Sequence, residues 1–191
     1  YIGTSVKEII RDGFSLETEH GMITIVEIMG RNAGWLTGAS ALSKGEDCTG
    51  PDAIYLPELP FEIDKFVGKC EELLKKKSSI VITVSEGIRT KDGKYVCEMS
   101  DTSNYVDAFG HKQLTGTARY LASLIATKLG CKTRAIELST LQRSASHCAS
   151  RVDIREAYEV GGAAMKAADE GDTGKMVVIQ RLSDDPYQAG T

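Results

Sequence analysis

Short, continuously apolar runs alternate along the chain with longer segments whose apolar residues recur at helical spacing. The apolar runs are rich in β-branched residues, which is typical of strands buried on both faces of a sheet. They lie at residues 22–29, 53–56, 79–84, 134–138 and 176–179. The segments between them predict helices at residues 4–11, 34–42, 61–77, 112–129 and 153–169. This alternation predicts an α/β fold with a mostly parallel sheet flanked by helices.

One long polar segment interrupts the alternation. Residues 90–111 are polar and irregular, so we expect a loop or a small hairpin there. A connection of this length inside a compact domain is more often functional than structural.

Composition narrows the class of protein only moderately. Of the 191 residues, 41% are hydrophobic and 26% charged, and the net charge of −4 gives no reason to expect nucleic acid or an anionic membrane as a partner. There is no signal-peptide pattern and no apolar run of the roughly 18 residues that a membrane helix needs. The five cysteines have no zinc-site spacing, so we expect unreactive thiols in a reducing cytoplasm. Because the first residue is Tyr1 and not methionine, we also expect a piece of a longer protein.

Charged residues and glycines follow three of the predicted strands directly. The segment Gly30–Gly34 contains Arg31 and comes after the first strand, Glu86 follows the third, and Arg143 follows the fourth. In open parallel sheets, ligands bind beyond the carboxyl ends of the strands. Glycines allow close approach of the backbone, arginine binds phosphate through paired hydrogen bonds, and a carboxylate accepts hydrogen bonds from sugar hydroxyls. Together these positions predict a sugar-phosphate pocket, and the sequence has neither GxxxxGK[ST] nor GxGxxG, the usual nucleotide motifs.

Three segments also resemble those of a known family. Val26–Arg31 (VEIMGR), followed by Ala33–Leu36 (AGWL), resembles the MGR segment of the phosphofructokinases. Val84–Ile88 (VSEGI) is similar to that family's second sugar-binding segment. Lys132–Ala135 (KTRA) and Leu141–Arg143 (LQR) resemble its late arginine region. The order and spacing agree over roughly residues 1–181.

The resemblance implies a function and a set of site residues. The reaction would be phosphoryl transfer to the 1-hydroxyl of fructose 6-phosphate, giving fructose 1,6-bisphosphate. Arg31 would bind fructose 6-phosphate and would neutralise negative charge on the phosphoryl group during its transfer. Glu86 would bind a sugar hydroxyl. Arg134 would reach the 6-phosphate bound to a neighbouring subunit, which implies a homo-oligomer. The substrate-binding set would be Met29, Gly30, Arg31, Glu86, Arg134, Thr140, Leu141, Gln142 and Arg143.

Some family features are absent or altered in these residues. The glycine-rich donor loop and the segment with the catalytic aspartate do not occur, so we expect them, together with the ligands of Mg²⁺, upstream of Tyr1. The isolated chain would then be inactive. Met22 stands where many members have a basic residue, and Thr140 where many ATP-using members have histidine. Residues 107–111 and 141–150 resemble the pyrophosphate-dependent branch, although the donor could be ATP or pyrophosphate.

We therefore expect residues 1–150 to form a fructose-6-phosphate-binding domain, and residues 151–191 to pack on the donor-binding domain. Two other interpretations remain. The chain could belong to a non-catalytic sugar-phosphate-binding or regulatory paralogue, or to an unrelated two-lobed solute-binding protein in which the three strand-end charges are accidental.

Overall fold

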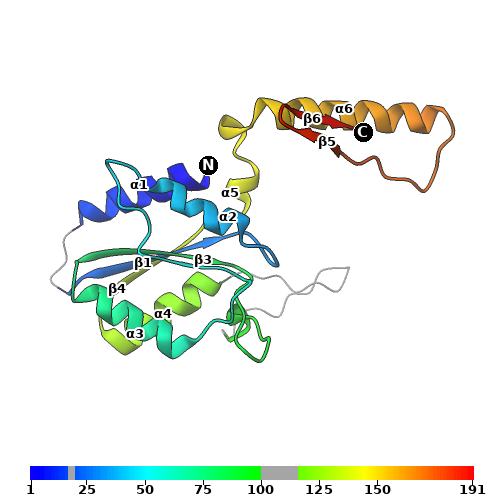
Figure 1. The fold of residues 1–191 in the computed structure, drawn as a ribbon. Coiled ribbons are helices and arrows are strands. Elements are labelled where there is room, and N and C mark those ends of the chain that lie inside the picture. The colour runs from blue at the N-terminus through cyan, green and yellow to red at the C-terminus, as the bar shows by residue number, and fades with distance from the viewer. Residues whose placement is uncertain (17–19, 100–115) are drawn as a thin grey trace. The chain divides into compact units, whose positions relative to one another are not determined.

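A computed structural model describes residues 1–16, 20–99 and 116–191 of the chain. Helices and strands alternate through most of this part, as expected (Figure 1). The strands are β1 (Met22–Ile28), β2 (Ala53–Tyr55), β3 (Ser79–Ser85), β4 (Lys132–Glu137), β5 (Gln180–Asp184) and β6 (Tyr187–Gly190). The α-helices are α1 (Ile2–Phe14), α2 (Trp35–Gly38), α3 (Ile63–Leu74), α4 (Thr117–Leu129), α5 (Ser139–Arg143) and α6 (Arg151–Asp169). Three 3-10 helices are η1 (Ala39–Ser43), η2 (Val96–Met99) and η3 (Ser146–Cys148).

The first four strands form one sheet in the order β2-β3-β1-β4, and every neighbouring pair in it is parallel. All seven residues of β1 are buried, which explains why this strand reads as continuously apolar. The predicted parallel α/β fold is therefore confirmed.

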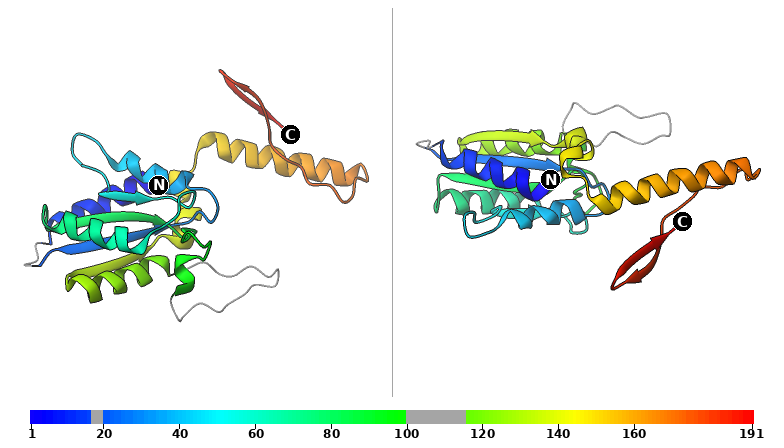
Figure 2. Two further views of the ribbon diagram at one scale, coloured as in Figure 1. Left: turned by 60° about the horizontal axis from the view of Figure 1, so that its bottom comes forward. Right: turned by 90° about the horizontal axis from the view of Figure 1, so that it is seen from above.

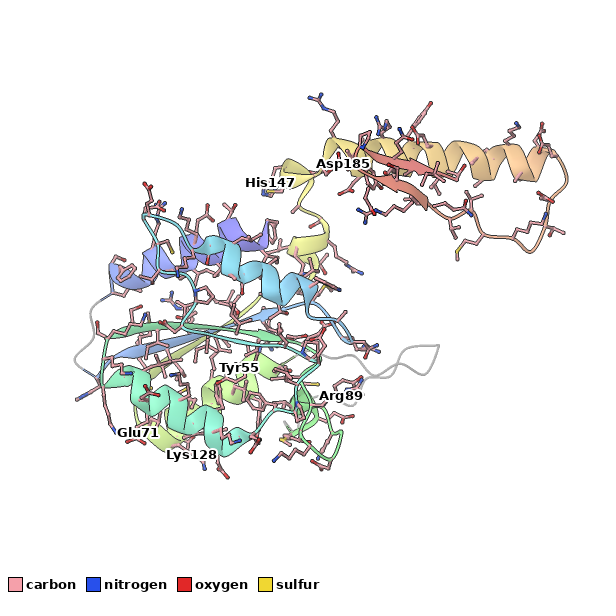
Figure 3. The ribbon with its side chains drawn as sticks, in the orientation of Figure 1. Tyr55, Glu71, Arg89, Lys128, His147 and Asp185 are labelled. Carbon is pink, nitrogen blue, oxygen red and sulfur yellow. The ribbon has the colours of Figure 1, made fainter. Side chains whose placement is uncertain are left out.

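Helices cover both faces of this sheet (Figures 1 and 2). Alternate side chains of β1 point to opposite faces. Ile23 and Ile25 pack in the core formed with α3 and α4, whereas Val26 and Ile28 pack in the core formed with α1. A cluster of three rings, Tyr55, Phe61 and Phe66, closes the first core beside α3, with ring centroids 5.2–5.4 Å apart. Figure 3 labels Tyr55 at the end of β2.

Several predicted boundaries differ from the structure. Helix α1 runs from Ile2 to Phe14, longer than predicted, and the predicted helix 34–42 is divided into α2 and η1. Strand β4 begins at Lys132 and ends at Glu137. Helix α4 begins at Thr117, after Gly116 with its left-handed φ of 97°, and ends at Leu129. Gly130, with a left-handed φ of 66°, stops it as expected. The rest of the predicted start of this helix, and most of the 90–111 segment, lie outside the described residues.

The predicted strand at residues 176–179 is wrong. These residues belong to no ladder, and Met176 is 84% exposed. The strand begins at Gln180 instead, because β5 pairs with β6 in an antiparallel hairpin whose register matches Gln180 with Gly190. Apolar, β-branched sequence alone does not make a strand without a partner to share its hydrogen bonds.

The contacts divide the chain into two compact units, Tyr1–Ser144 and Ala145–Thr191. The first contains the four-stranded sheet and its cores. The second contains α6 and the β5–β6 hairpin, where the hydroxyl of Tyr187 donates to the Glu156 carboxylate at 2.6 Å. The expected division of roles between residues 1–150 and 151–191 stays a prediction.

Candidate functional site

The carboxyl ends of β1 and β3 carry two loops that bind each other directly. The main-chain N–H of Gly30 donates to the Glu86 carboxylate at 3.3 Å, and the N–H of Glu86 donates to the Ile28 carbonyl at 3.0 Å. The Ser85 hydroxyl donates to the Gly30 carbonyl oxygen. The predicted neighbours Gly30 and Glu86 are thus brought together by hydrogen bonds from both loops.

Glycines make this approach possible. A Cβ on Gly87 would lie 1.9 Å from the Arg31 carbonyl oxygen, a distance that no side chain tolerates. Gly30 has a φ of 154°, and a Cβ there would lie 2.7 Å from the carbonyl oxygen of Ala33. The glycines therefore let Arg31 lie against the Glu86 loop.

A third segment joins from the end of β4. The short helix α5 begins at Ser139, whose φ of 43° turns the chain sharply after the strand. From this helix, the side-chain oxygen of Gln142 accepts a hydrogen bond from the Met29 N–H at 2.9 Å. This bond fixes α5, and with it Arg143, beside the loop of Arg31.

The charges of the three loops converge on Glu86. Burial raises the pKa of the Glu86 carboxyl, while the Gly30 N–H and the positive charges of Arg31 and Arg143 act in the opposite direction. Arg31 and Arg143 therefore both lie near enough to this half-buried carboxylate to act on its charge. Such an arrangement can hold a phosphate and a hydroxyl at the same time.

Two further residues, Glu58 and Arg89, form hydrogen bonds to the loop of Arg31. The Gly34 N–H donates to the Glu58 carboxylate at 2.6 Å. Arg89, labelled beyond the end of β3 in Figure 3, donates to the Asn32 side chain at 3.0 Å and stacks 4.2 Å from the centre of the Tyr95 ring. Hydrogen bonds at Gly30, Asn32 and Gly34 leave this loop little freedom.

Not every predicted site residue contacts the loops of Arg31 and Glu86. Arg134 is inside β4 on the face toward α1, and its guanidinium pairs with Asp12 at 2.8 Å. Thr140 and Leu141 lie on α5 and are exposed. The structure thus brings together Met29, Gly30, Arg31, Glu86, Gln142 and Arg143, whereas the role expected for Arg134 between subunits stays a prediction.

The sequence reasoning did not single out three residues that shape the site. Glu58 follows β2 and could have been found by the same strand-end rule that found Glu86. Glu27 is a buried charge within an apolar strand, which is itself a signal. Arg89 carries no signal in the sequence, because only the folded loops bring it to Asn32.

The described part of the chain contains neither a membrane-spanning helix nor a cluster of possible metal ligands. In residues 1–16, 20–99 and 116–191, no helix is long and apolar enough to cross a membrane. In the same ranges, no group of three or more histidine, cysteine, aspartate or glutamate side chains could hold a metal ion. Within them none of the five cysteines forms a disulfide, and four of the five are buried.

Comparison with known proteins identifies the family. The family model "Phosphofructokinase" matches residues 3–168. The chain belongs to the phosphofructokinase family. The predicted resemblance is therefore confirmed.

Individual members of the phosphofructokinase family are longer than this chain. The chain is 39% identical over 187 residues to a pyrophosphate–fructose 6-phosphate 1-phosphotransferase of Halomonas elongata, covering 98% of the chain and 44% of that relative. It is 30% identical over 162 residues to ATP-dependent 6-phosphofructokinase 3 of Streptomyces coelicolor, covering 84% of the chain and 44% of that relative. A pyrophosphate-dependent phosphofructokinase from Marinobacter aquaeolei has a similar structure, with a TM-score of 0.70, 30% identity, and 100% of this chain and 43% of that one covered. The chain thus spans less than half the length of these relatives.

Proposed function

We propose that this chain is the fructose-6-phosphate-binding part of a 6-phosphofructokinase that makes fructose 1,6-bisphosphate. The observation that supports this most is the convergence of Arg31 and Arg143 on Glu86 at one sheet edge. A carboxylate whose charge is felt by two guanidinium groups matches a ligand that carries both hydroxyls and a phosphate. Membership of the family and the activity for which the Halomonas elongata relative is named point to the same substrate.

Each site residue would have a role that follows from its chemistry. Glu86 would accept a hydrogen bond from a sugar hydroxyl, and Arg143 would bind the 6-phosphate with Thr140, Leu141 and Gln142. Arg31 would neutralise negative charge on the transferring phosphoryl group, since phosphoryl transfer depends mainly on positioning and charge neutralisation. The main-chain N–H groups of Met29 and Gly30 are engaged by Gln142 and Glu86, so these two residues would contact the sugar through their other atoms.

The remaining parts of the reaction would lie outside this chain. The catalytic aspartate and the ligands of Mg²⁺ would belong to another part of the parent protein, where the ion would offset charge on the donor phosphates. A homo-oligomer, in which Arg134 reaches a neighbouring site, and a cytoplasmic location complete the proposal.

Pyrophosphate is the donor we favour. The chain is more similar to the pyrophosphate-dependent Halomonas elongata relative than to the ATP-dependent one from Streptomyces coelicolor. The test is a coupled assay on the full-length parent with fructose 6-phosphate and Mg²⁺, giving pyrophosphate or ATP in separate reactions. Turnover with pyrophosphate supports the proposal, and turnover with ATP alone reverses the choice of donor. A folded parent with no turnover would instead favour a non-catalytic sugar-phosphate-binding protein.

A substitution tests the phosphate clamp. Arg143→Ala in the parent should raise the KM for fructose 6-phosphate on the order of tenfold to a hundredfold, because a charge-assisted hydrogen bond is lost. Lys75→Ala is the control, since its exposed ammonium group pairs with Glu71, at 2.8 Å, one turn back along α3. An unchanged KM in Arg143→Ala would remove Arg143 from the site.

A further inference from the structure

Glu27 is a buried carboxylate that the proposed chemistry does not use. It is 4% exposed and lies on β1 next to Glu137 of β4 in the sheet register. Its carboxylate accepts a hydrogen bond from the N–H of Ala118, at the start of α4, at 2.8 Å. No ion pair of Glu27 occurs among the described residues. Burying a carboxylate without a cation is unfavourable, so this residue calls for a reason.

The first turn of α4 touches the ends of three strands. Beside the bond from Ala118 to Glu27, the Thr117 hydroxyl donates to the main-chain oxygen of Glu86 at 3.2 Å. The guanidinium of Arg119 pairs with Glu137 at 2.8 Å. Consecutive residues of one helix turn are thus attached to β1, to the loop after β3 and to β4.

Glu27 takes the place of a local cap for this helix. The residue before α4 is Gly116, which has no side chain to accept a hydrogen bond from the first free N–H groups. A carboxylate also interacts favourably with the positive end of the helix dipole. If Glu27 only capped α4, it would stabilise the helix and nothing else. Because Thr117 in the same turn binds Glu86, a fixed first turn of α4 also holds the sugar-binding loop in place.

We infer that Glu27 is a positioning residue for the sugar-phosphate site: it fixes the first turn of α4, and Thr117 in that turn fixes the backbone of Glu86. This inference rests on the proposed function for its kinetic consequence, but not for its structural one. When the turn shifts, Glu86 loses its place opposite Arg31. The affinity for sugar phosphate then falls, while the affinity for the phosphoryl donor does not.

Kinetics of the full-length parent test the inference. Thr117→Val keeps the shape and removes the hydroxyl, so the KM for fructose 6-phosphate should rise roughly fivefold, the effect of about one lost hydrogen bond. The kcat and the KM for the donor should stay unchanged. The matched control is Thr127→Val in the last turn of α4, where the exposed hydroxyl only donates to Ser123 at 2.9 Å. Because Thr117 also bonds the buried Cys97 thiol, Cys97→Ala separates that contact.

Two variants of Glu27 complete the series. Glu27→Ala leaves the Ala118 N–H without its acceptor and should reproduce the kinetic pattern of Thr117→Val with a larger rise in KM. Glu27→Gln keeps an oxygen that accepts from Ala118 and should restore most of the affinity. If Thr117→Val leaves the KM for fructose 6-phosphate as it was, or lowers kcat and both KM values alike, the inference is wrong.

A second readout needs no turnover. Hydrogen–deuterium exchange of the peptide spanning residues 84–89 in the parent should accelerate in Thr117→Val and Glu27→Ala, but not in Thr127→Val or Glu27→Gln. Acceleration in a parent that shows no turnover would support the positioning role while refuting the proposed function. Unchanged exchange in both variants overturns the positioning role, whatever the activity.

Discussion

The charge of Glu27 makes the stability of this protein depend on pH in a direction opposite to that of most carboxylates. Burial raises the pKa of Glu27 from its ordinary value of 4.5 to about 7, with further contributions from the negative charges of Glu137 and Glu86. The hydrogen bond from Ala118 opposes this rise only in part. Between about pH 4.5 and about pH 7 the folded protein therefore retains a proton on Glu27 that the unfolded chain has released.

The sign and size follow from proton linkage. Below about pH 4.5 both states are protonated at this site, so the ionisation of Glu27 takes nothing from the free energy of unfolding. As pH rises from 4.5 to about 7, the folded state binds more protons than the unfolded state, so the free energy of unfolding falls. The difference between the two pKa values corresponds to about 3 kcal/mol, all of it lost above about pH 7.

The perturbation is Glu27→Gln, which has almost the same shape and cannot ionise. Urea unfolding of the wild type and the variant, followed by circular dichroism at about pH 5 and about pH 8, gives the free energy of unfolding of each. Other titrating groups cancel in the difference between the proteins, as does any pH-independent cost of the amide. Relative to the wild type, Glu27→Gln should gain about 2–3 kcal/mol between the two pH values.

A constant difference between wild type and Glu27→Gln across this range would refute the reasoning. It would mean that Glu27 ionises in the folded protein at the same pH as in the unfolded chain. If Glu27→Gln instead lost stability relative to the wild type as pH rose, Glu27 would be a stabilised carboxylate in the folded protein. An ion pair in the folded protein would then outweigh the effect of burial.

Four further substitutions have defined outcomes. Gly87→Ala places a Cβ 1.9 Å from the Arg31 carbonyl oxygen, so it should lower the free energy of unfolding by about 1–3 kcal/mol and raise the KM for fructose 6-phosphate. Gly68→Ala in α3, where the added Cβ meets open space, should raise the free energy of unfolding by up to about 1 kcal/mol. Urea unfolding midpoints measure both changes in stability. Glu86→Ala should raise the KM for fructose 6-phosphate by a factor on the order of ten while the KM of the donor stays constant, and a selective loss of donor affinity would contradict the pocket described. Phe66→Ala, which removes a fully buried ring, should cost about 3–5 kcal/mol, and a loss below about 1 kcal/mol would mean that the aromatic cluster repacks.

The sequence by itself predicted the elements correctly where the pattern of apolar residues matches the burial of the element in the fold. The apolar runs of β1 and β3 lie in the centre of a parallel sheet, where both faces must be apolar, so their composition predicts their place. The sequence also predicted that Arg31, Glu86 and Arg143 lie at one edge of the sheet. Parallel strands end at a common edge, and the chain continues from there directly into the ligand-binding loops.

The sequence misled where structure depends on a partner. The apolar residues 176–179 read as a strand, but the hairpin register of β5 and β6 starts at Gln180. The identity of a strand is decided by which neighbour accepts its hydrogen bonds, and that neighbour is not encoded in the run itself.

What the sequence alone determined was the fold class, the order of most elements and the loops that carry the candidate chemistry. Only the tertiary structure decided how these loops are held. The bond from Met29 to Gln142 joins residues 113 positions apart, and the bond from Ala118 to Glu27 joins residues 91 positions apart. Arg134 pairs with Asp12 across 122 positions. Periodicity reports which face of its own element a residue occupies, whereas contacts of such long range arise only when the sheet is assembled. The sequence can therefore mark Glu27 as an unusual charge in an apolar strand, but only the structure shows that it binds the start of α4.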